Sequence, residues 1–244
     1  MEAKYRNPRF SDPSSNNECK DLLLRYINSN KKNHAEKRTS HAYSYIKELS
    51  KQIESFIRSM YGSEKDRYLT YDVIYKGKYE AGLREVDLLK LVSPTEIVIG
   101  EVKLTCNKRN AIHSGLKQLK KRAEILKPQY TNIKCELIIV DILNNSTEEL
   151  TDETLFSNSK TIKNEEGFQY NLIVIPAFQL FKYMSAKKSA TLEFKELQNN
   201  AENEAQEYYE KRMQSKMEKI SEKIERMIFG EKQDHTLYDF QLSA

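Results

Sequence analysis

The sequence predicts an α/β fold in which a mixed sheet is flanked by helices and is followed by a long helical C-terminal arm. Three observations support this prediction. Apolar residues recur every three or four positions in residues 39–62, which is the period of an amphipathic helix. Strand-like and helical segments then alternate over residues 68–187. Finally, residues 191–229 are almost free of Gly and Pro.

The composition is typical of a folded chain that also carries solvated helices or tails. Its 244 residues are 39% hydrophobic and 31% charged, with a formal net charge of +4, and this length favours one or two domains. No apolar run is long enough to cross a bilayer, and the first 20 residues contain no apolar region of the signal-peptide kind. We therefore expect a soluble intracellular protein, cytoplasmic or nuclear, with no membrane partner.

The first half of the chain is expected to contain an arm, a helix and three strands. Residues 1–38 are rich in Asn, Ser, Lys and Pro, which predicts a mostly flexible arm with one short helix. The amphipathic helix over 39–62 follows. Turn signals then separate expected strands at 68–79, 83–92 and 96–104. Because the loops between these strands are short, we expect an antiparallel meander.

The second half begins with an expected helix over residues 110–127, which Pro128 closes. Two apolar runs, 135–142 and 170–175, predict buried strands. Pro176 then begins a helix that continues to about residue 187. Residues 144–167, between the two buried strands, form a polar excursion.

Residues 191–229 predict one long amphipathic helix. From Met213 to Met227 the apolar residues are spaced by 4, 3, 4 and 3 positions, which is a heptad pattern about two heptads long. This pattern favours either a coiled coil, through which the chain forms a homodimer, or a helix folded back onto its own domain. The expected domains are therefore an N-terminal arm (1–38), a core (39–188) and a helical C-terminal arm (189–244).

Acidic residues in two neighbouring strands carry the strongest functional signal. If the second and third strands pair as a hairpin, Asp87 and Glu101 converge, with Lys103 beside them, because side chains alternate faces along a strand. Two converging carboxylates are costly unless a cation neutralises them. Oxygen ligands without adjacent His or Cys favour Mg²⁺ or Mn²⁺. Such a site suits hydrolysis of a phosphodiester, in which the lysine orients or deprotonates water or offsets charge.

The order of these features resembles the PD-(D/E)XK nuclease superfamily, in its Holliday-junction-resolvase-like branch. The segments R-E-V-D-L-L and I-G-E-V-K-L carry the resemblance, which extends over residues 40–142. It implies a restriction-endonuclease-like αβββαβ core. It also implies a metal-dependent nuclease, more specifically an endonuclease, that acts on DNA in preference to RNA.

The resemblance also implies roles for individual residues. The catalytic set that it implies is Asp87, Glu101, Lys103 and Gln118. The metal ligands that it implies are Asp87, Glu101 and a glutamate of the first helix, for which Glu54 is favoured over Glu48. Val86 occupies the position of the nominal Pro, which is a frequent change.

Basic residues are concentrated next to this motif. Eight Lys and Arg lie between residues 107 and 134, against the single acid Glu124. Such a cluster is expected to contact a phosphate backbone, the alternative being a solvated helix face. The expected nucleic-acid contacts are Lys108, Arg109, Lys117, Lys120, Lys121 and Arg122.

Two other functions stay open at this point. The chain could be a nuclease-fold protein that binds nucleic acid or a partner without cutting it, or an assembly module that acts through its C-terminal helix. The presence of all three motif side chains favours the enzyme.

Overall fold

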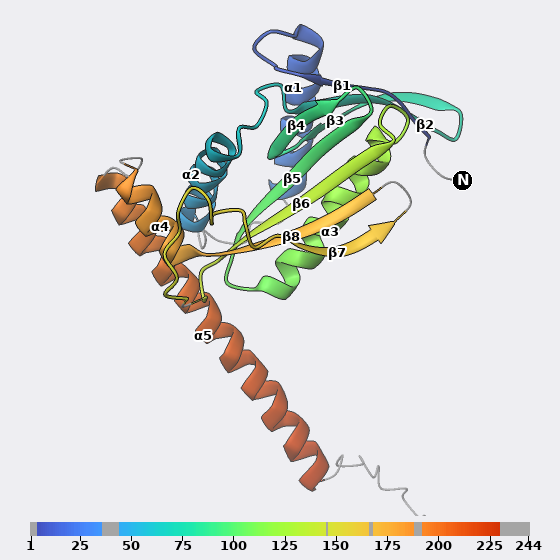
Figure 1. Cartoon of the computed structure of the whole chain (residues 1–244). Helices are drawn as coiled ribbons and strands as arrows, with labels where there is room; N and C mark the ends of the chain where they lie inside the picture. Colours follow the sequence, from blue (N-terminus) through green and yellow to red (C-terminus); the bar gives the residue numbers. More distant parts are fainter. Residues whose placement is uncertain (1–3, 36–43, 145, 166–167, 188–191, 230–244) are drawn as a thin grey trace, which may run out of the picture. The chain divides into compact units, whose positions relative to one another are not determined.

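A computed structural model describes residues 4–35, 44–144, 146–165, 168–187 and 192–229 (Figure 1). The chain forms two compact units, Met1–Ala205 and Gln206–Ala244. The first unit is an α/β structure with a mixed five-stranded sheet, a three-stranded antiparallel sheet and flanking helices. The predicted fold class, a mixed sheet flanked by helices, is therefore confirmed.

The five-stranded sheet has the order β4-β5-β6-β8-β7. Its strands are β4 (Leu88–Ser93), β5 (Glu96–Thr105), β6 (Asn132–Asp141), β7 (Lys160–Glu165) and β8 (Phe168–Pro176). The three central strands, β5, β6 and β8, are parallel, whereas the edge strands β4 and β7 pair antiparallel to their neighbours. The central strands are nearly continuous runs of Val, Ile and Leu because helices cover both faces of the sheet.

Helix α3 (Lys108–Leu126) connects β5 to β6 and packs on one face of the sheet, where Leu119 and Ala123 are buried against Leu137. Helices α2 (Ser44–Tyr61) and α4 (Ala177–Ala186) contribute to the core on the opposite face (Figure 1). Because β5 and β6 are parallel, they need a crossover connection, and α3 supplies it. The helices predicted over 39–62 and 110–127 are thus confirmed; residues 36–43 lie outside the described part of the chain.

The three-stranded sheet consists of β1 (Lys4–Ser11), β2 (Tyr68–Tyr75) and β3 (Lys78–Glu85), in the order β1-β2-β3. Lys76 and Gly77 turn the β2–β3 hairpin with positive φ angles of 50° and 76°. Two consecutive positive φ angles are the conformation that a tight two-residue hairpin turn requires. Helix α1 (Asn17–Ala35) contacts β3.

The prediction of one antiparallel meander over residues 68–104 is wrong, because these residues contribute strands to two different sheets. The segment expected as one strand over 83–92 is divided: β3 ends at Glu85 in one sheet, and β4 begins at Leu88 in the other. The turn expected at residues 81–82 lies inside β3. Local apolar pattern indicates that a segment is a strand but not which sheet the strand joins. The pattern therefore does not reveal that β3 and β4 belong to different sheets.

Two strands were missed. Residues 4–11 form β1 and are followed by a 19-residue helix, where the sequence predicted a mostly flexible arm with one short helix. The pairing of β1 shifts between Arg6 and Arg9, and such an irregularity disrupts the two-residue alternation of a strand. Strand β7, in the expected polar excursion, has the sequence KTIKNE and is an edge strand, which needs few apolar residues.

Helix α5 (Leu192–Phe229) confirms the long helix predicted over 191–229. Its first part contributes Ala201 to the core of the first unit. In the second unit, Tyr209, Met213, Met217 and Ile220 are between 40% and 60% exposed. No helix within the described ranges has the length and apolar character needed to span a membrane.

Candidate active site

The β4–β5 hairpin brings the two predicted carboxylates together. Leu88 pairs with Gly100, so Asp87 and Glu101 are the next residues along the two chains. A Cβ atom on Gly100 would lie only 2.8 Å from Cβ of Leu88, and glycine therefore permits the close approach of the strands here. Oδ2 of Asp87 accepts a hydrogen bond from the backbone N–H of Val102 at 2.8 Å. The predicted convergence is thus present, although Asp87 lies just before β4 and not within a strand.

Glu101 is almost fully buried, with 2% of its surface exposed, and both of its carboxylate oxygens have cationic partners. Nζ of Lys103 donates to Oε1, and Nη1 of Arg122, which projects from α3, donates to Oε2. Arg122 is itself buried. A buried carboxylate is tolerated when cations pair with it and satisfy its oxygens. The two cations therefore satisfy both oxygens of this buried carboxylate.

Among the described residues, no ion pair joins Asp87 to a cation. Burial and the negative charge of Glu101 raise the pKa of Asp87 to about 7, against a smaller lowering by the hydrogen bond from Val102. The charge of Arg122 lowers this pKa only as a minor contribution. Arg58 of α2 holds the backbone beside this group, because its Nε donates to the carbonyl oxygen of Asp87 at 3.1 Å. Arg58 was not expected from the sequence, since its only signal is a position near the end of an amphipathic helix.

The structure distinguishes the two glutamates that the sequence left open. Glu54 is half-buried on α2; burial raises its pKa, the hydrogen bond from Ser50 lowers it, and the charge of Glu101 raises it further. Glu48 is exposed and pairs with Lys51 at 2.8 Å. Of the two, Glu54 is therefore the one that interacts electrostatically with Glu101 and Asp87 at the hairpin.

The donor set fits a hard divalent cation with two protein carboxylates. Nowhere in the described ranges do three His, Cys, Asp or Glu side chains group closely enough to hold a metal ion by themselves. Asp87 and Glu101 nevertheless offer oxygen donors, and a cation between them would offset the burial and repulsion that raise the pKa of Asp87. Glu54 interacts electrostatically with both carboxylates but does not form a three-carboxylate group with them.

A cavity of about 250 Å³ lies beside Asp87. It is lined by Tyr26, Arg84, Glu85, Asp87, Gln118, Lys121 and Arg122. Gln118, predicted from the resemblance, and Lys121 therefore lie at the site, whereas Glu85 forms an ion pair with Arg67. Tyr26 comes from α1, in a region where the sequence indicated only a short helix. No local signal connects that tyrosine with residues 58 or more positions further along the chain.

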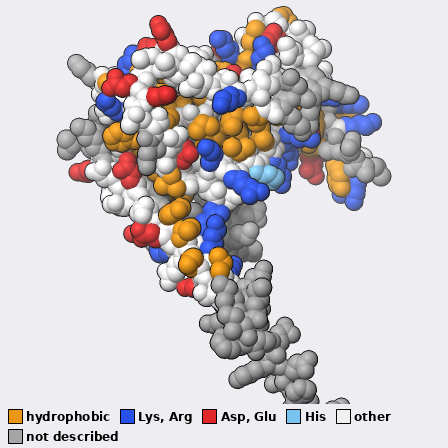
Figure 2. Space-filling view, turned by 60° about the horizontal axis from the view of Figure 1, so that its bottom comes forward, with side chains coloured by type: hydrophobic (Ala, Val, Ile, Leu, Met, Phe, Trp, Pro, Cys, Tyr) orange, Lys and Arg blue, Asp and Glu red, His pale blue; other side chains and the backbone are white. Residues whose placement is uncertain are grey.

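The expected nucleic-acid contacts divide into two groups. Five are exposed at or along α3: Lys108, Arg109, Lys117, Lys120 and Lys121. Arg122 differs, because it is buried and pairs with Glu101, so the expectation that it contacts phosphate is replaced by a role inside the site. Figure 2 brings forward the side of the molecule that lies at the bottom of Figure 1, and Lys and Arg side chains are distributed over its centre.

The fold and the site define an α/β protein with a pair of carboxylates at a hairpin end, held next to a lysine and a buried arginine. The sequence matches no model of a known protein family, and no curated protein is significantly similar to it.

We expect the metal-free protein to lose stability as the pH rises from about 5 to about 7. The ordinary pKa of an aspartate is 3.8, whereas that of Asp87 in the folded state is about 7. Between these values the folded state binds a proton that the unfolded state has released, so the free energy of unfolding falls with rising pH. Urea unfolding in EDTA at both pH values would measure this. Asp87→Asn should show a weaker pH dependence, and an unchanged dependence would contradict the assignment.

Proposed function

We propose that this chain is a metal-dependent nuclease, more specifically an endonuclease, that hydrolyses phosphodiester bonds and acts on DNA in preference to RNA. One observation carries the proposal: Asp87, Glu101 and Lys103 lie together at the end of one hairpin, and two carboxylates beside a lysine suit phosphodiester hydrolysis. Lys121 lines the cavity beside Asp87, and the other exposed Lys and Arg side chains lie along the same helix, α3, which supports binding of a phosphate backbone.

The order of elements supports a restriction-endonuclease-like core of the PD-(D/E)XK kind. Helix α2 precedes the antiparallel β4–β5 hairpin, which is followed by α3 and by β6, parallel to β5. The departure from an αβββαβ core is that the strands preceding this hairpin, β2 and β3, belong to the separate three-stranded sheet. The proposal therefore rests on the hairpin, the helix and the acidic pair more than on the whole sheet.

In this proposal, Asp87 and Glu101 would hold Mg²⁺ or Mn²⁺, and Glu54 would add negative charge near them. The ion would polarise the phosphoryl oxygen and lower the pKa of a bound water. Lys103 has a partly exposed side chain and can turn from Glu101 to the negative charge that develops on the phosphate. Arg122 holds the Glu101 carboxylate in place through their ion pair.

Cleavage assays on the purified chain test the proposal. Single-stranded DNA, duplex DNA and RNA are each incubated with Mg²⁺, with Mn²⁺ or with EDTA. We expect DNA to be cut with either metal and to stay intact in EDTA. If no nucleic acid is cut but one is bound with strong salt dependence, the chain is a nuclease-fold binding protein without catalysis, and the proposal is wrong.

We further propose that α5 pairs two copies of the chain. Met213, Met217 and Ile220 continue a heptad pattern and are largely exposed within the second unit. Burying such a seam against a second copy removes apolar surface from water. We expect light scattering to give twice the mass of one chain.

Acidic substitutions in the seam test this pairing. Met213→Glu combined with Met217→Glu is expected to give monomers, because four carboxylates would face one another across the seam. The control, Ser215→Glu with Lys219→Glu, adds acids outside the heptad seam and should stay dimeric. A monomeric wild type would exclude the interface.

A further inference from the structure

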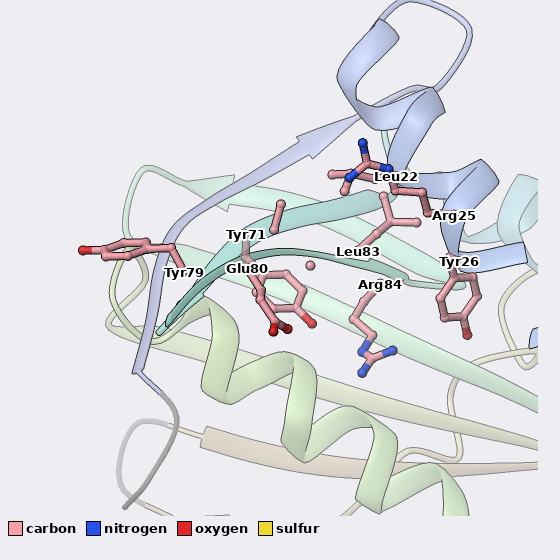
Figure 3. A pocket seen from close by; sticks show the side chains of 10 residues that line it. Leu22, Arg25, Tyr26, Tyr71, Tyr79, Glu80, Leu83 and Arg84 are labelled. Carbon is pink, nitrogen blue, oxygen red and sulfur yellow. The ribbon is translucent and has the colours of Figure 1, made fainter. Parts of the chain in front are cut away.

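A second cavity, of about 590 Å³, lies along β3 next to the candidate active site (Figure 3). Its walls come from α1, β2 and β3, and the residues important here are Arg25, Tyr26, Tyr71, Glu80 and Arg84. Tyr26 and Arg84 also line the smaller cavity beside Asp87. The two cavities are therefore neighbours that share a wall, and a single polymeric ligand can extend through both.

Tyr71 contributes to the wall of this cavity from the core, with only 7% of its surface exposed. It pairs across the strands with Gly82, and a Cβ atom on Gly82 would collide with the ring of Tyr71. Glycine therefore allows the ring to lie over the backbone of β3. Burial raises the pKa of Tyr71, while the charge of Arg84 and a hydrogen bond from it lower that pKa. The Arg84 guanidinium therefore lies close enough to Tyr71 to interact with it electrostatically.

Tyr26 supplies a second, more accessible ring, with 43% of its surface exposed. Figure 3 shows that Tyr26, Tyr71 and Arg84 project to the same side of β3. Aromatic rings on which bases stack, combined with arginine, are the features by which proteins hold unpaired nucleotides. The volume is within the range of about 300–1,000 Å³ that is typical of sites for small molecules. A cavity of this size accommodates a nucleotide and not a duplex.

The charges in the cavity indicate an orientation. Glu80 and Arg84 lie four residues apart on β3, which separates them by about 13 Å along the strand. A carboxylate repels phosphate and accepts hydrogen bonds from amino groups, whereas a guanidinium binds phosphate. The phosphate is therefore expected at Arg84, toward Asp87, and the base toward Tyr71 and Glu80.

We propose that the second cavity binds an unpaired nucleotide adjacent to the phosphodiester that is cleaved, so that the substrate is a nucleic acid with a single-stranded segment at the site. This inference rests on the proposed nuclease function and specifies its substrate class. The shared residues, Tyr26 and Arg84, connect the nucleotide cavity to the acidic pair.

Binding measurements on the full chain in EDTA test the inference without cleavage. Fluorescence anisotropy compares a labelled single-stranded DNA with a blunt duplex of the same sequence. We expect the wild type to bind the single strand more tightly. Tyr26→Ala should raise the Kd for the single strand about tenfold and change the Kd for the duplex less than about twofold, because a stacking surface is lost.

Two variants control for unrelated effects. Tyr26→Phe keeps the ring and should bind the single strand as the wild type does. Tyr45→Ala removes a tyrosine of α2 that is equally exposed, at 44%, and should also leave binding unchanged. Equal affinity of the wild type for both forms, or single-strand binding unaffected by Tyr26→Ala, would overturn the inference.

Cleavage assays separate this inference from the proposed function. If the wild type cuts DNA with Mg²⁺ but Tyr26→Ala binds single strands normally, the nuclease proposal stands and the nucleotide cavity is wrong. If single-strand binding depends on Tyr26 and no metal supports cleavage, the nucleotide cavity stands and the nuclease proposal is wrong.

Discussion

Asp87→Asn is expected to lower metal-dependent cleavage of DNA by about 100- to 1,000-fold, the range seen when a group that stabilises developing charge is removed. Asparagine keeps the size of the side chain and can still accept the hydrogen bond from the backbone of Val102. It loses the negative charge that, with Glu101, attracts a divalent cation. The variant should therefore cleave bound DNA more slowly and require a higher metal concentration. It should still fold.

Lys103→Met is expected to cause a loss of similar size in the cleavage rate, with a smaller change in the metal requirement, because the lysine offsets charge on the phosphate and is not a ligand. Both variants are compared with wild type over a range of Mg²⁺ concentrations.

Two glutamate variants of α2 serve as a matched pair for this assay. Glu48 is exposed and paired with Lys51, so Glu48→Gln should cleave as the wild type does. Glu54 interacts with the charges of Glu101 and Lys103, so Glu54→Gln should cleave more slowly. Full activity of Asp87→Asn would exclude the acidic pair as the site of catalysis.

Arg122→Met is expected to lower the free energy of unfolding by about 3 kcal/mol, which is the lower end of the effect of breaking a buried ion pair. Arg122 pairs with Oε2 of Glu101, and the Glu101 carboxylate is buried among apolar strands. Without the guanidinium, Lys103 is the remaining ion-pair partner of that carboxylate within the described part of the chain. Urea unfolding monitored by circular dichroism measures the change.

A double variant identifies the cause of this loss. Combining Arg122→Met with Glu101→Gln removes the uncompensated charge, so its destabilisation should be smaller than the sum for the single variants. Lys121→Met changes an exposed neighbour on the same helix and should alter stability by less than about 0.5 kcal/mol. An additive double variant would show that Arg122 and Glu101 do not act as a pair.

Local sequence patterns were sufficient to predict the helices and strands whose apolar residues recur with a strong periodicity. The apolar spacing in α2 and α3 and the Val, Ile and Leu runs of β6 and β8 depend only on neighbouring residues, and the structure contains all four elements. The meeting of Asp87 with Glu101 was also predictable, because it follows from side-chain alternation and a tight hairpin. Each of these inferences concerns residues close together in the chain.

Long-range contacts determined the remainder. The chain passes from one sheet to the other at residues 86–87, where no Gly or Pro interrupts the sequence. Arg122 belongs to a basic cluster in the sequence, yet it is buried against Glu101, 21 positions earlier. Tyr26 reaches the same site from α1. Local periodicity specifies which face of an element is apolar, but the packing of distant elements decides which charged groups are buried together and therefore paired.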